Sequence, residues 1–163
     1  MEREVKDWLI KVEGIKNGEV DLSRDEDLSI ALMNLISLEE HFYFTAMKTN
    51  NQKNLEMLND VREMRKKLLK RIVKNPQGEE WCISKHLLAS SMRLIEVGTK
   101  ELSKGDSEEA NFFFQSAFQL YSLFFAINLN MVEVKEIETA SPKSGTMQKI
   151  SQIIKAIVDC CKE

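Results

Sequence analysis

Apolar residues recur every three or four positions over most of this chain, the spacing of one face of an α-helix. The pattern predicts six helices, with approximate ranges 2–16, 23–48, 52–74, 79–103, 106–130 and 145–161. Alternation with a period of two is not sustained over any convincing length in the sequence, so strands are not expected. The sequence therefore predicts an all-α fold.

Polar turns separate the predicted helices. Asn50 and Asn51 form one, residues 75–78 (Asn-Pro-Gln-Gly) form a second, and Gly105 marks a third. Residues 131–144, with Pro142, read as a connector. Because short connections make consecutive helices antiparallel neighbours, we expect an antiparallel up-and-down bundle of five or six helices.

The whole chain, residues 1–163, is expected to form one α-helical domain, since 163 residues suffice to bury a core. The composition is globular, with 43% hydrophobic and 30% charged residues. A net charge of −3 does not suggest a general nucleic-acid binder. The charged N-terminal segment lacks the features of a signal peptide. Three cysteines, two of them adjacent, suggest reduced thiols in a cytoplasmic protein.

The segment 94–121 resembles a single tetratricopeptide-type repeat. Its small and large residues stand at that pattern's positions: Leu94, Gly98, Gly105, Ala110, Phe114 and Ala117. Gly98 and Ala110 would let two helices approach closely, with Phe114 filling the gap. The pattern is broken by Glu101, where an aromatic is usual, and by Ser122, where proline is usual. The segment has 28 residues, most of a repeat that is about 34 residues long. The resemblance implies a surface that binds peptides or proteins.

The same hairpin also resembles part of the HEPN family of small helical bundles, which are often RNases or their relatives. That family's catalytic signature is an arginine followed four to six residues later by a histidine. Lys85 and His86 have no arginine at that distance upstream. The resemblance therefore carries no catalytic residue to this chain, and we expect a protein that is not an enzyme.

The helix at 106–130 holds seven of the chain's twelve aromatic residues. A helix that is apolar nearly all round is normally the buried centre of a bundle, and this is one interpretation. The other is an oligomer or partner interface, because uncharged amides beside aromatics suit such surfaces. The predicted protein interface joins this helix's polar line to the face of helix 79–103: Arg93, Glu96, Asn111, Gln115, Gln119 and Ser122.

The only two histidines could form a metal site with a cysteine. Cys82 and His86 are spaced i, i+4 and so share one helix face. If the bundle brings His41 beside them, the three could hold zinc. The alternative is two interfacial histidines hydrogen-bonded to Glu40 or Glu79, with Cys82 as a small buried hydrophobic residue.

Basic residues form a ridge on the helix at 52–74. Arg62, Lys66, Lys70 and Lys74 are four positions apart. Such a ridge could contact RNA phosphates or an acidic partner, or it could be a solvated face favoured by the helix dipole.

The sequence as a whole favours a cytoplasmic, non-catalytic protein-binding or adaptor bundle that binds a protein partner or forms a homo-oligomer. Association with a membrane is not expected. The alternatives are a metal-binding bundle that uses His41, Cys82 and His86, and an RNA-associated protein that uses the basic ridge.

Overall fold

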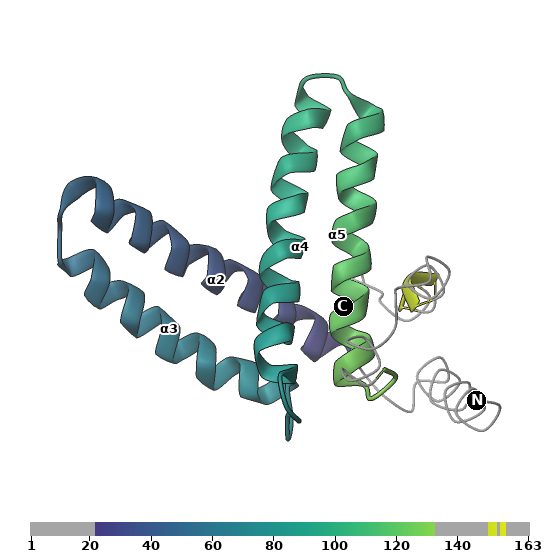
Figure 1. Cartoon of the computed structure of the whole chain (residues 1–163), viewed down its shortest axis with the longest axis horizontal. Helices are drawn as coiled ribbons and strands as arrows, with labels where there is room; N and C mark the ends of the chain where they lie inside the picture. Colours follow the sequence, from purple (N-terminus) through teal and green to yellow (C-terminus); the bar gives the residue numbers. More distant parts are fainter. Residues whose placement is uncertain (1–21, 133–149, 153, 156–163) are drawn as a thin grey trace.

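The computed structural model describes residues 22–132, 150–152, 154 and 155 of the chain (Figure 1). Its four long helices are α2 (Ser23–Thr49), α3 (Lys53–Ile72), α4 (Glu80–Ser103) and α5 (Ser107–Asn128). Each begins and ends within about two residues of its predicted range. The described residues include no strand, and the all-α prediction is confirmed.

Three of the predicted segments lie largely outside the described residues. The helix at 2–16 is wholly outside them, and so is most of the connector at 131–144. Of the segment predicted at 145–161, the described residues 150–152, 154 and 155 are helical.

The helix ends follow from a few polar and glycine residues. Asn50 and Asn75 adopt left-handed backbone conformations, with φ of 51° and 52°, which asparagine tolerates better than most residues. Gly105, with φ of 85°, makes the turn between α4 and α5. The carboxylate of Asp106 then accepts a 3.0 Å hydrogen bond from the Glu109 amide and caps α5.

The four helices form two antiparallel hairpins that diverge from one end, as Figure 1 shows. The most extensive helix packing is between α4 and α5, followed by that between α2 and α3. The helix α2 touches α4 over a shorter stretch. The antiparallel bundle is therefore confirmed, with the added feature that the hairpins share a core only where they meet.

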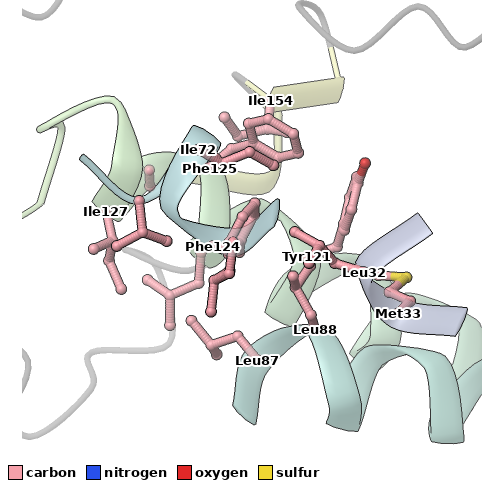
Figure 2. Packing of buried hydrophobic residues seen from close by; sticks show 14 of the residues in the cluster. Leu32, Met33, Ile72, Leu87, Leu88, Tyr121, Phe124, Phe125, Ile127 and Ile154 are labelled. Atoms are coloured by element: carbon pink, nitrogen blue, oxygen red, sulfur yellow. The ribbon is translucent and has the colours of Figure 1, made fainter. Parts of the chain in front are cut away.

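That shared core draws on every one of the described long helices (Figure 2). Leu32 and Met33 of α2, Leu88 of α4 and Phe124 of α5 are at most 2% exposed. Ile154, from the helical residues near the C-terminus, joins the same cluster. The far ends of both hairpins extend beyond this core, and their outward side chains meet solvent.

Polar contacts also join the hairpins in the described part of the chain. Ser29 of α2 and Tyr121 of α5 share a 2.7 Å hydrogen bond between their hydroxyl groups inside the core. At the surface, Arg93 of α4 donates a 2.9 Å hydrogen bond from Nε to Glu40 of α2. The buried Ser29–Tyr121 hydrogen bond fixes how α2 lies against the α4–α5 hairpin, since buried polar groups need their partners.

The α4–α5 hairpin depends on a close approach at Gly98. A Cβ atom at this position would lie 2.7 Å from Cε1 of Phe114 and 3.2 Å from the carbonyl oxygen of Ala110. The packing role predicted for these three residues is therefore observed.

Replacing Gly98 with alanine is expected to destabilise the protein by a net amount of about 0–2 kcal/mol. The added methyl group overpacks the helix contact at a cost of about 1–3 kcal/mol. The gain in helix propensity, about 1 kcal/mol, offsets part of that cost. Urea unfolding followed by circular dichroism measures the change. In a Phe114→Leu background the same substitution should cost less, and a net stabilisation by Gly98→Ala in the wild type would contradict the described packing.

None of the helices in the described part of the chain combines the length and the apolar character needed to cross a membrane.

Candidate protein-binding surface

The surface in the angle between the two hairpins contains two open hollows beside α2. The first, here called the α2–α4 hollow, has a volume of about 710 Å³. Its lining includes Glu40, His41, Tyr43, Phe44 and Lys48 of α2 and Arg93 of α4. The second, the three-helix hollow, has a volume of about 640 Å³ and is lined by residues of α2, α3 and α4. Glu40 and Tyr43 line both.

An ion pair bridges the angle where the hairpins begin to separate. The guanidinium of Arg93 lies 2.6 Å from the carboxylate of Glu40, measured from Nη2 to Oε2. Both side chains are about half exposed. An ion pair this exposed contributes little stability, at most about 1 kcal/mol. Its main consequence is to hold Arg93 towards α2, at the edge of the α2–α4 hollow.

A buried ion-pair cluster lies under the three-helix hollow. Arg65 of α3 donates two hydrogen bonds to the carboxylate of Glu39 in α2, at 2.8 and 3.2 Å. Arg62 donates a third to the same carboxylate, at 3.0 Å. The side chains of Arg65 and Glu39 are only 7% and 9% exposed, whereas that of Arg62 is 51% exposed.

The two arginines lower the pKa of Glu39. Burial alone would raise the pKa of this carboxyl group, but the hydrogen bonds from Arg65 and Arg62, together with their positive charges, outweigh that effect. Glu39 is therefore an ionised carboxylate near neutral pH, and it holds two arginine side chains in place.

Large apolar side chains are exposed along the same helix. Tyr43 is 48% exposed, and Phe44 and Met47 are each 57% exposed. The rings of Tyr43 and Phe44 pack edge to face, with centroids 5.2 Å apart. Aromatic residues and methionine are enriched where proteins bind one another, so this stretch of α2 has the composition of an interface.

The residues predicted to form the protein interface fall into different environments. Arg93 lies at the angle between the hairpins, and Glu96 is exposed one turn further along α4. On α5, Asn111 and Gln115 are exposed and Gln119 is half-buried.

Ser122 is fully buried, so the prediction that it belongs to the protein interface is corrected. Its hydroxyl donates a 2.7 Å hydrogen bond to the Phe118 carbonyl within α5. The physical reason is that α5 passes from the exposed arm into the shared core. Residues 121–127 are all buried there, and the polar line of the helix enters the core with them.

The three predicted metal ligands are not gathered into one site. His41, Cys82 and His86 are all exposed, which also corrects the alternative of a buried cysteine. His41 lines the α2–α4 hollow and His86 lines the three-helix hollow. Within residues 22–132, 150–152, 154 and 155, no group of three or more His, Cys, Asp or Glu residues could hold a metal ion. The zinc prediction thus lacks a ligand cluster there.

The predicted basic ridge is split by its own ion pairs. Arg62 is bonded to Glu39, and Lys66 lies 2.8 Å from the carboxylate of Glu63. Lys70 and Lys74 are exposed further along α3 and its C-terminal turn, outside both hollows. Half of the ridge thus belongs to the lining of the three-helix hollow, since Arg62 and Lys66 both contribute to it.

Several residues of this surface were not predicted from the sequence. A signal was present for Glu39 and Arg65: each stands on its helix's apolar stripe, Glu39 after Leu32 and Ile36, and Arg65 between Val61 and Leu69. Opposite charges at two such positions on neighbouring helices indicate a buried pair. The sequence contains no comparable signal that Tyr43 and Phe44 are exposed, because their exposure depends on how far the hairpins diverge.

Comparison of the chain with protein-family models, with curated proteins and with solved structures found no match in any of the three. The likenesses of residues 94–121 to a tetratricopeptide-type hairpin and to part of a HEPN bundle therefore stay predictions.

Proposed function

We propose that this protein is a non-catalytic, cytoplasmic adaptor that binds another protein in the angle between its two hairpins. The observation that carries the proposal is the exposed Tyr43, Phe44 and Met47 stretch of α2, next to hollows lined by charged residues. Burying aromatic and methionine side chains at the centre of a contact is a main source of binding free energy between proteins.

The charged groups around the hollows support a binding role rather than a catalytic one. Glu39 and Glu40 are both engaged by arginines, in ion pairs that hold neighbouring helices together. Both are poor general bases, because the arginines lower the pKa of Glu39 and hydrogen bonds from arginines occupy lone pairs of both carboxylates. The exposed thiol of Cys82 is consistent with a reducing compartment such as the cytoplasm.

A second copy of the chain is the alternative partner for the same stretch of α2. A self-associating protein would bury Phe44 against its own copy and change its mass with concentration. Light scattering over a concentration series separates this case from binding to a different protein.

The proposal is tested by affinity capture from extract of the native cells, with and without nuclease. Wild type is compared with Phe44→Ser and with the matched control Phe112→Ser. Phe112 is 61% exposed on α5 and lies outside both hollows, so both substitutions remove a similarly exposed ring.

We expect wild type and Phe112→Ser to retain the same stoichiometric protein partner after nuclease treatment, and Phe44→Ser to lose most of it. Loss of every partner on nuclease treatment would reject the protein-binding proposal in favour of nucleic acid. Equal retention by the two variants would show that the partner binds elsewhere on the chain.

A further inference from the structure

The three-helix hollow is locally positive on a chain whose net charge is −3. Four cationic side chains contribute to its lining, from Arg62, Arg65, Lys66 and Lys85, against the carboxylates of Glu39 and Glu40. The local charge of the hollow is thus opposite in sign to the net charge of the chain. This matters because a concave surface concentrates the electric field of its charges and attracts groups of opposite charge.

The carboxylates of the hollow are already engaged within the protein. Glu39 accepts hydrogen bonds from both Arg62 and Arg65, so one negative charge faces two positive ones. Glu40 is paired with Arg93 of α4, which lines the α2–α4 hollow. The half-exposed guanidinium of Arg62 therefore keeps donors directed at solvent, since a single Nε–H satisfies its bond to Glu39.

Lys85 adds a charge from the opposite wall. It lies on α4, it is half-buried, and within the described part of the chain it forms no ion pair. Lys66 stands on α3, paired only with exposed Glu63. Between the cations on these two walls lies a position where an anionic side chain would neutralise their positive charge.

Apart from the exposed imidazole of His86, the rest of the lining consists of aliphatic side chains and one aromatic ring. Ile36 is buried at 8% exposure, and Leu58 and Ala89 are half-buried. Tyr43 contributes an exposed ring to the same hollow. A ligand that fits would present aliphatic or aromatic groups together with negative charge.

We propose that the three-helix hollow binds an acidic, amphipathic segment of a partner protein, with carboxylates on Arg62, Lys66 and Lys85 and apolar side chains on Ile36, Leu58 and Ala89. This inference rests on the proposed function, and it adds the chemistry of the partner. The buried Glu39–Arg65 pair supports it, because that pair fixes the floor of the hollow before a ligand arrives.

A protein segment fits this hollow better than a nucleic acid does. Glu39 and Glu40 lie among its cations and would repel a continuous phosphate backbone, whereas separate carboxylates can be placed to avoid them. Aliphatic side chains on the walls also match a peptide better than a sugar–phosphate chain. The experiment must therefore distinguish binding of a protein segment from binding of nucleic acid.

The test uses the full chain and a displayed library of random 16-residue peptides, with fluorescent poly(U) RNA as a parallel probe. Selected peptides are then measured by fluorescence anisotropy against two double charge reversals. Lys66→Glu/Lys85→Glu alters the hollow, and Lys70→Glu/Lys74→Glu makes the same change of charge at exposed positions outside it. Circular dichroism confirms that each variant keeps its helix content.

We expect the enriched peptides to carry net negative charge with apolar residues at helical spacing. Their affinity should fall about tenfold or more in Lys66→Glu/Lys85→Glu, as expected when charges at the centre of a contact are reversed. It should change about twofold or less in Lys70→Glu/Lys74→Glu, because charges at the periphery of an interface are largely screened. Added salt should weaken the binding.

Three results would overturn the inference. One is a library that yields no binder, or binders without an acidic bias. Another is equal weakening of binding by both double variants. The third is tight binding of poly(U) RNA that Lys66→Glu/Lys85→Glu abolishes, which would assign the hollow to nucleic acid. Non-acidic binders that are lost in Phe44→Ser would reject the acidic partner while leaving the proposed protein-binding function in place.

Discussion

Replacing Phe124 with alanine is expected to destabilise the protein by about 3–5 kcal/mol. Phe124 has no exposed surface and lies in the core shared by both hairpins. Removing its ring forfeits the burial of the aromatic group and leaves a cavity among rigidly packed neighbours such as Leu87 and Leu88 of the same cluster. Urea unfolding at neutral pH, followed by circular dichroism, measures the loss.

Phe112→Ala is the matched control on the same helix. Its ring is 61% exposed on the arm of α5, so the same substitution should change stability by about 0.5 kcal/mol or less. Similar losses for the two variants would contradict the arrangement in which α5 runs from an exposed arm into a buried core.

Replacing Glu39 with leucine is expected to cost about 3–5 kcal/mol, because it leaves the buried guanidinium of Arg65 without its carboxylate. The side chain of Arg65 is only 7% exposed, so water cannot replace the lost partner without a rearrangement of α3. Replacing both residues, Glu39→Leu with Arg65→Leu, should recover most of the loss, since the pair then becomes an apolar contact. A double variant no more stable than Glu39→Leu would contradict a direct pairing.

The same ion-pair cluster makes the stability depend on pH. The pKa of Glu39 is lower in the folded protein than its ordinary value of 4.5. The ionised carboxylate therefore contributes fully to the free energy of unfolding at any pH above 4.5. The contribution is lost as the pH falls below 4.5 and through the pKa of the folded state. Glu39→Gln should therefore show a shallower loss of stability than the wild type between neutral pH and acid, in unfolding curves measured at a series of pH values.

The secondary structure could be predicted from the sequence because local signals determine it. The apolar period of 3.6 gave the ranges of α2 to α5, and Asn50, Asn75 and Gly105 marked their ends correctly. The close approach at Gly98 was also predictable, since a glycine opposite Ala110 and Phe114 has few other packing solutions.

The arrangement of the hairpins could not be predicted in the same way. How far α2 diverges from α4 depends on packing in the shared core, between residues distant in the sequence. That divergence decides that Tyr43 and Phe44 are exposed, that Ser122 is buried, and that His41 and His86 line different hollows. Arg62 and Lys66 looked like parts of a solvated ridge for the same reason, because the opposite wall at Lys85 comes from another hairpin.

The central claim is that the angle between the hairpins binds protein, and photo-crosslinking tests it most directly. A photoreactive phenylalanine derivative is placed at position 44 or, as the control, at position 112, and the protein is irradiated in extract of the native cells. We predict a nuclease-resistant protein adduct from position 44 and little or none from position 112. Adducts of equal yield from both positions, or adducts from position 44 that nuclease removes, would contradict the claim.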